Sequence, residues 1–216
     1  MTPLSDFERY VLPFVADAPR PAVQDAILDA CVEFCTRTRI LRTNPVTVAL
    51  DGDRDEYQLD APTDSTTVVD VVGVWLPEGQ ISPLTRPDLD AMYPAGWAGL
   101  KVSTTALVRG FYCRLPGLIR LIPSVSAPTF NLTVMVSYAP KRSASSVDDV
   151  LFERFAEVIA AGALGRLHQH PGTAYADPLR VAGYLQLFES AIIRFADEAQ
   201  RCFAYRPLRT GQDEFA

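Results

Sequence analysis

The chain has 216 residues, of which 48% are hydrophobic and 21% charged, and its formal net charge is -6. This composition is typical of a globular protein with a core of its own, and it excludes a chain kept disordered by its charges. An acidic protein has no general attraction for phosphate, so a protein that grips nucleic acid is disfavoured, whereas one that surrounds DNA without holding it is compatible with this charge.

The first segments of the chain are predicted to be helical. Residues 3–16 form a short helix that a proline interrupts. A second, amphipathic helix is predicted over residues 20–39, because apolar side chains recur there at helical spacing. Its narrow apolar stripe consists of Val23, Ile27, Cys31, Phe34 and Thr38.

The middle of the chain has the patterns of β-strands. The clearest lies in "FNLTVMVSY" (residues 130–138), where apolar and polar side chains alternate, as in a half-buried antiparallel strand. Residues 66–76 are rich in valine and apolar on both faces, which favours a central strand. Residues 107–115 and 118–123 are predicted to be joined by a Pro-Gly turn.

The last third is predicted to hold two long helices. Ser146 and Asp149 have the form of a capping box, with Asp in place of the usual Glu, and predict the start of the first helix. A Pro-Gly pair breaks it, and the second helix is predicted over residues 177–204. The apolar stripe of the second helix is expected to include Tyr184, Leu187, Phe188, Ala191, Ile192, Phe195 and Phe203.

Because the strands come in one block, the predicted fold class is α+β. We expect a helical bundle, made by the N-terminal helix and a long C-terminal helical hairpin, with an inserted antiparallel β region of about six strands. The whole chain, 1–216, is then a single domain with N-terminal helices over 1–44, the β insertion over 45–140 and the helical hairpin over 145–204. Residues 205–216 are expected to form an extended C-terminal arm.

The two histidines of the chain, His168 and His170, are two positions apart, which raises the question of a metal site. On a helix such residues point about 200° apart, so they cannot both face one ion while helical. The nearest acidic residue is Asp177, and zinc-site spacings are absent. We interpret the pair as a solvated helix end, where a histidine favours the helix C-terminus, with a metal-binding turn as the alternative.

The four cysteines lack Cys-x-x-Cys spacing, which is typical of free thiols in a reducing compartment. They are Cys31, Cys35, Cys113 and Cys202. Cys31 and Cys35 lie four residues apart and therefore on one face of the predicted helix. We expect both to be small hydrophobic side chains of the core rather than a redox or metal pair.

Residues 51–57 ("DGDRDEY") place Asp51, Asp53 and Asp55 at alternate positions, as a calcium-binding loop does. The rest of that pattern is missing, because the second residue rather than the sixth is glycine and the twelfth is proline, so we expect a solvated hairpin tip. Catalytic serine, phosphate-loop and dinucleotide motifs are also missing from the sequence. We therefore predict that the protein is not an enzyme, with no catalytic residue, no metal and no cofactor.

Three stretches carry a recognisable pattern. Residues 7–40 contain a Val-Leu-Pro turn, an Ala-Pro break and a Glu-Phe-Cys helix end; residues 57–76 have a strand pattern; and residues 147–192 combine a Gly-Ala-Leu-x-Arg-Leu helix end, a proline-containing turn and a long second helix. Together they resemble the head-to-tail adaptor (connector) proteins of tailed bacteriophages, the family of the portal-binding ring.

This resemblance implies a structural virion protein at the neck of the particle, synthesised in the host cytoplasm. The expected assembly is a homo-oligomeric, typically dodecameric, ring that docks on the portal protein and on the tail tube or nozzle. The genome DNA is expected to pass through the ring without specific binding. No segment approaches the ~18 consecutive apolar residues of a membrane span, so no membrane partner is expected.

The sequence is also compatible with three alternative interpretations. One is another ring-forming tail or tail-completion protein, a second is a small enzyme using Asp or His groups, and a third is an unrelated α+β domain. Binding to tail components rather than to the portal would favour another tail protein. A convergent pocket of titratable groups would favour an enzyme.

The segment 205–216 ("YRPLRTGQDEFA") combines apolar and arginine side chains after the helical stripe ends, and its proline discourages further helix. The adaptors that the chain resembles extend a C-terminal segment onto the portal, which implies a portal-docking arm here; a frayed terminus is the alternative. The expected anchors of the arm are Tyr205, Arg206, Leu208, Arg209 and Phe215.

Overall fold

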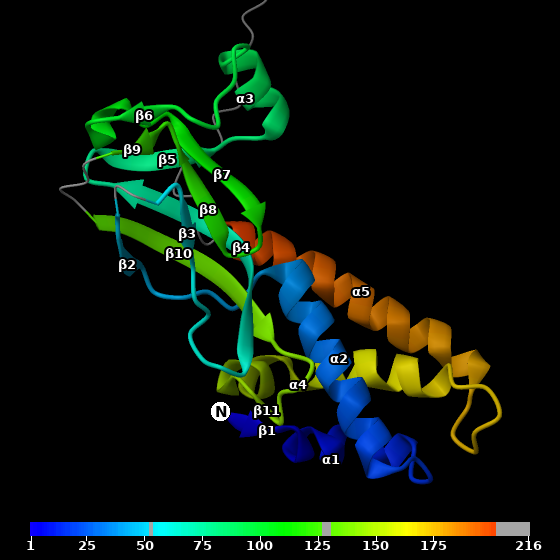
Figure 1. Cartoon of the computed structure of the whole chain (residues 1–216). Helices are drawn as coiled ribbons and strands as arrows, with labels where there is room; N and C mark the ends of the chain where they lie inside the picture. Colours follow the sequence, from blue (N-terminus) through cyan, green and yellow to red (C-terminus); the bar gives the residue numbers. More distant parts are fainter. Residues whose placement is uncertain (52–53, 127–130, 202–216) are drawn as a thin grey trace, which may run out of the picture.

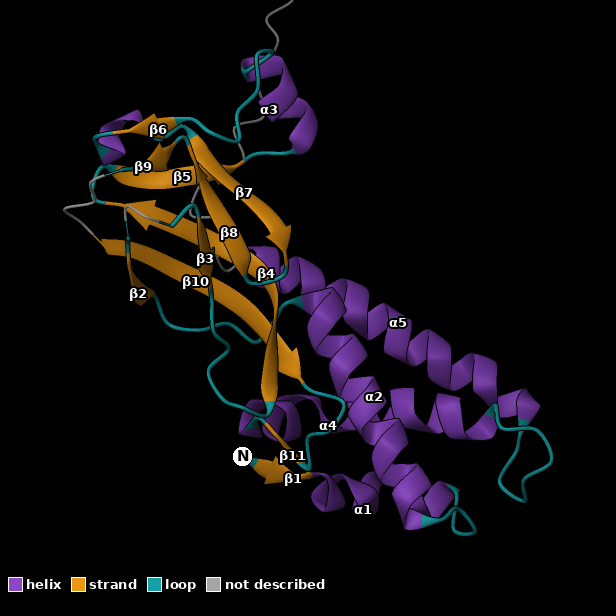
Figure 2. Cartoon of the chain, viewed as in Figure 1, coloured by secondary structure: helices purple, strands orange, loops and turns teal. Residues whose placement is uncertain are grey.

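In the computed structural model, residues 1–51, 54–126 and 131–201 are described, and the fold is given for these. The long helices gather at one end of the molecule and most of the strands at the other, as Figure 1 shows. Two long strands, β4 (Thr66–Leu76) and β10 (Asn131–Pro140), run from the strand-rich end toward the helices, which Figure 2 makes plain.

The helical end is built from segments at the beginning and the end of the described chain. They are η1 (Leu4–Phe7), α1 (Glu8–Val11), η2 (Leu12–Phe14), α2 (Arg20–Thr38), α4 (Asp149–His168) and α5 (Pro178–Arg201). The helix α2 ends where Arg39 adopts a left-handed backbone conformation with φ 53°. At the start of α4 the carboxylate of Asp148 accepts a hydrogen bond from the Val150 N–H at 3.1 Å, so Asp148 caps this helix in place of the predicted Ser146.

The strand-rich end is a seven-stranded sheet in the described residues, with the order β2-β10-β4-β5-β7-β8-β3. Its other strands are β2 (Val46–Ala49), β3 (Glu56–Gln58), β5 (Gly79–Pro83), β7 (Gly110–Leu115) and β8 (Leu118–Ile122). Smaller pairs are β1 (Thr2–Pro3) with β11 (Ser146–Val147) and β6 (Lys101–Val102) with β9 (Ser124–Val125), and the short helices are α3 (Arg86–Met92) and η3 (Thr105–Leu107). The alternation predicted for β10 is confirmed, because Leu132, Val134 and Val136 are buried.

The predicted fold is correct only in being α+β. The expectation of a helical bundle with a C-terminal hairpin and an inserted antiparallel region of about six strands is wrong. The sheet is mixed, since β5 and β7 pair in parallel with Ser82 opposite Gly110. Alternation along a strand indicates which face is buried but carries no information on its neighbours, so this long-range pairing was not visible in the sequence.

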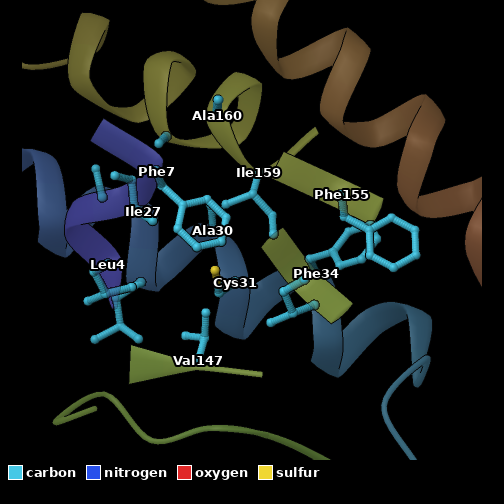
Figure 3. Close-up of a cluster of buried hydrophobic side chains, with 14 of the residues drawn as sticks. Leu4, Phe7, Ile27, Ala30, Cys31, Phe34, Val147, Phe155, Ile159 and Ala160 are labelled. Carbon is cyan, nitrogen blue, oxygen red and sulfur yellow. The ribbon is translucent and has the colours of Figure 1, made fainter. Parts of the chain in front are cut away.

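Two hydrophobic clusters hold the described part together. One lies among the helices, and Figure 3 shows its centre, where Phe7, Ile27, Phe34 and Phe155 pack around α2 and α4. The other lies in the sheet. The strand β10 contributes to both, because Leu132 belongs to the sheet cluster and Ala139 to the helical cluster.

Close packing of α4 against α5 depends on Gly162. A Cβ atom there would lie 2.8 Å from Cδ2 of the buried Phe188 ring, so the two helices can approach only because this side chain is missing. We predict that Gly162→Ala lowers the free energy of unfolding by about 1–3 kcal/mol in urea denaturation. The matched control is Gly183→Ala on α5, where a Cβ meets nothing within 4 Å and should stabilise the helix by up to about 1 kcal/mol. Equal midpoints for the two variants would contradict this account.

Candidate functional site

The histidine pair does not form a common site. His168, in the last turn of α4, is 3% exposed, while His170 is exposed beyond the helix end. The Nδ1–H of His168 donates a hydrogen bond of 2.7 Å to the carbonyl oxygen of Tyr175, and its ring stacks on Tyr184 with centroids 5.6 Å apart. The prediction of a solvated helix end is therefore wrong for His168, which ties the turn after α4 to α5.

A structural role for His168 has a direct consequence for stability. We predict that His168→Ala lowers the free energy of unfolding by about 2 kcal/mol, because it removes a buried hydrogen bond and a ring contact. His170→Ala should change it by less than about 0.5 kcal/mol. Thermal and urea unfolding of both variants test this, and equal losses for the two would contradict it. Stoichiometric zinc, lost in His168→Ala, would restore the metal-site reading.

The paired cysteines of α2 lie in the core, as predicted. Cys31 and Cys35 are both 0% exposed. Burial raises the pKa of the Cys31 thiol to about 12 and also raises the pKa of Cys35. Because the thiolate is the reactive and metal-binding form, both side chains act as small hydrophobic groups.

The acidic loop after β2 lies partly outside the described residues, which include Asp51 and Asp55 but not Asp53. Asp51 pairs with Arg54 at 3.3 Å, and Asp55 pairs with Arg120 at 3.1 Å. Across residues 1–51, 54–126 and 131–201, no three His, Cys, Asp or Glu side chains are grouped so that they could hold a metal ion.

Charged side chains of α2, α4 and α5 form a network of ion pairs and hydrogen bonds that joins the three helices. Arg37 of α2 donates to both carboxylate oxygens of Glu189 on α5, at 2.5 and 2.7 Å, and to Glu33 at 2.9 Å. Glu33 in turn accepts a hydrogen bond from Arg166 of α4. The hydrogen bonds from Arg37 hold the pKa of the Glu189 carboxyl below its usual range. The network joins three helices at the surface and so fixes their relative positions.

The most unusual surface is the side of α5 that points away from the core. The name α5 face is used here for Leu179, Gly183, Leu187, Ser190 and Arg194. Leu179 is 94% exposed and Leu187 is 61% exposed. A hollow between α4 and α5 borders this face, and the residues that line it include Val158 and Ala161 of α4. Exposed apolar surface of this kind is typical of a protein interface.

The α5 face was not predicted from the sequence. Leu187 was expected on the core stripe, whereas Phe188, Ile192 and Phe195 are the buried members of that stripe. The available signal was a second apolar row on the same helix, at Leu179 and Leu187, about half a turn from the buried one. A helix that is apolar on two sides is expected to have two partners.

The anchors predicted for the C-terminal arm, Tyr205, Arg206, Leu208, Arg209 and Phe215, lie outside the described residues. Within the described part, no helix has the length and apolar character needed to cross a bilayer.

Comparison with known families identifies the chain. The SU10 adaptor protein family matches residues 2–211, which is nearly the whole sequence. The chain belongs to this family. A search of the curated proteins finds no match. Membership confirms the resemblance to phage head-to-tail adaptors that residues 7–40, 57–76 and 147–192 indicated, and it makes this SU10 adaptor a bacteriophage structural protein of the virion that interacts with other head or tail proteins.

Proposed function

We propose that this SU10 adaptor forms a homo-oligomeric ring between the portal and the tail, around the channel through which the genome passes. The observation that carries the proposal is the family match over residues 2–211. The exposed apolar surface of α5 supports it, because a ring of identical subunits needs large surfaces that a single copy leaves uncovered.

The charge of the protein suits a channel. A lining that must let DNA slide has to avoid many simultaneous contacts from Lys and Arg to phosphate, since each contact adds to the affinity. The chain has 26 acidic and 20 basic residues. Many arginines are already engaged by carboxylates of the same chain, as Arg37, Arg142 and Arg166 are. Within the described residues, this pairing lowers the number of arginines that are left to hold the passing DNA.

A non-catalytic role agrees with the chemistry of the described residues. Burial keeps the thiols of Cys31 and Cys35 protonated. The Nδ1–H of the buried His168 is held by the Tyr175 carbonyl and its ring stacks on Tyr184, while its Nε2 has no hydrogen-bond partner among the described residues. A nucleophile, a base and a group that orients the base do not meet in one described pocket.

Residues 205–216 are proposed to bind the portal, a role separate from that of the helices. The chain acts as one adaptor unit, in which the segment after α5 reaches the portal while the region 45–140 projects from the helices. The apolar and arginine side chains of that segment suit a partner surface better than free solvent.

Binding to portal rings tests the proposed function. The purified chain should bind portal rings of the same phage saturably, with one copy per portal subunit, in analytical ultracentrifugation and native mass spectrometry. Binding to tail components alone would instead favour another ring-forming tail protein. A lack of binding to either partner would contradict the proposal.

A further inference from the structure

We infer that the α5 face of one copy docks into a groove along α2 of the next copy, so that neighbouring subunits meet through two different surfaces of the helical end. The name α2 groove is used here for Ala22, Asp25, Ala26, Asp29, Val32 and Thr36, with Arg166 of α4 and the residues just after α4, Gln169 and His170, as its far wall. The inference rests on the proposed ring and specifies its subunit contact.

The α5 face carries exposed apolar side chains, with a hollow beside Gly183, Leu187 and Ser190, that a neighbouring copy can cover. Leu179 and Leu187 project from it, and Ile193, which is 68% exposed, lies at its margin. Gly183 and Ser190 lie between these large side chains, and a Cβ at Gly183 would meet nothing within 4 Å. Large apolar side chains separated by small residues let a second helix approach closely.

The α2 groove is a hollow along one side of α2. Its α2 residues recur every three or four positions, so they lie on one side of the helix. Ala22, Ala26 and Val32 supply a partly apolar floor, and two cavities of about 550 and 350 Å³ lie along it. Most of the charged side chains beside this floor are already paired within the chain, Asp29 with Arg142 and Glu33 with Arg166. A row of apolar side chains from a neighbouring helix would fill such a floor.

The two surfaces have nearly equal lengths. From Leu179 to Arg194 the α5 face rises about 22 Å, and from Ala22 to Thr36 the α2 groove rises about 21 Å, at 1.5 Å per residue. A helix can therefore lie along the whole groove without leaving part of either surface uncovered.

The two surfaces open on different sides of the helical end. Glu157 of α4 lines the hollow beside the α5 face, and Arg166 of α4 lines the α2 groove. Nine residues separate them, which is about 180° around a helix. One copy can thus be held by a neighbour on each side, the arrangement that a closed ring or an open filament needs and that a two-fold dimer does not use.

Charge favours a second copy as the occupant. Arg194 on the α5 face makes no ion pair within the described residues, and it lies over the Phe195 ring at 4.3 Å. Asp25 in the α2 groove is exposed and also makes no ion pair within the described part of the chain. The basic group on one surface and the acidic group on the other can pair between copies. A DNA strand as the occupant would be repelled by the unpaired Asp25 and would leave the leucines uncovered.

Cross-linking of mixed cysteine variants tests the contact. Ser190→Cys marks the α5 face, and Ala22→Cys and Thr36→Cys mark the two ends of the α2 groove. With differently tagged chains and a short bis-maleimide, we expect Ser190→Cys to couple to one of the two groove variants, and the end to which it couples gives the direction of packing. The control is Ser103→Cys, which is exposed and follows β6, a strand at the opposite end of the molecule from α4 and most of α2 in Figure 1.

Two results would overturn the inference. One is a yield of cross-linked product between the α5 face and the groove that does not exceed the yield with Ser103→Cys. The same holds if the yield does not exceed that of the unsubstituted chain, whose own cysteines set the background. The other is dominant coupling of Ser190→Cys to itself, which indicates a two-fold contact between α5 faces.

A substitution separates the specific contact from random encounter. Adding Leu187→Asp to the Ser190→Cys chain should lower the yield of the mixed product by about tenfold, the effect of losing about 1.4 kcal/mol of association free energy. Leu107→Asp, at a leucine that is 48% exposed on η3, should leave the yield unchanged. Equal effects of the two substitutions would contradict the assignment.

Failure of this inference and failure of the proposed function look different. If portal rings bind the chain in a closed ring while the cross-links are absent, only the contact is wrong. If the cross-links form but the chain never binds a portal, the subunit contact is supported and the proposed ring between portal and tail is wrong.

Discussion

Replacing Phe34 with alanine is expected to lower the free energy of unfolding by about 3–5 kcal/mol, the largest stability loss of any substitution considered. Phe34 is 0% exposed, and its ring lies 5.1 Å from that of Phe155, 6.4 Å from Phe188 and 6.0 Å from Phe195. It therefore joins α2 to both α4 and α5, and its loss leaves a cavity that three helices would have to collapse to fill. Urea denaturation measures the difference.

The matched control for Phe34 is Phe14, which is 51% exposed and meets Tyr184 at its edge. Phe14→Ala should cost about 1 kcal/mol or less. Similar losses at the two positions would mean that the helical cluster is not the main source of stability.

Deletion of residues 205–216 is expected to abolish docking on portal rings while leaving the thermal midpoint close to that of the full chain. The deleted segment follows the last described turn of α5, so the buried clusters of the described residues stay complete. Portal binding by ultracentrifugation and thermal unfolding by circular dichroism measure the two effects separately.

Substitutions within residues 205–216 test whether the apolar side chains of the segment are responsible for docking. Changing Tyr205, Leu208 and Phe215 together to serine should reproduce the loss of docking. Changing Thr210, Gln212 and Asp213 to alanine should not, because these side chains lack the apolar surface that anchors an arm. Unchanged affinity in the truncated chain would refute the arm, and a lowered thermal midpoint would show that the segment belongs to the fold.

Local structure was the part of the fold that could be predicted. The helix expected over residues 20–39 is α2 (Arg20–Thr38), and the alternation in 130–138 marks β10 (Asn131–Pro140). These signals are local, because helical spacing and strand alternation are properties of one segment. The order of strands in the sheet was not predictable in this way, since the parallel pairing of β5 with β7 depends on contacts between distant residues.

Burial was harder to predict than secondary structure. His168 belongs to a residue type that is usually partly exposed, and it is buried where its ring stacks on Tyr184 and its Nδ1–H meets the Tyr175 carbonyl. Leu187 shows the opposite error, because its chemistry suits a core and its place on α5 leaves it exposed. In a protein that assembles, an apolar side chain can face its own core or a partner, and the sequence alone does not distinguish the two.

A cryo-electron microscopy map of the neck of the phage particle tests the central claim most directly. The account predicts a closed ring of identical copies of this chain between the portal and the tail, around the DNA, with the helical ends of neighbours in contact. A single copy, a two-fold dimer, or a position away from the portal would contradict it.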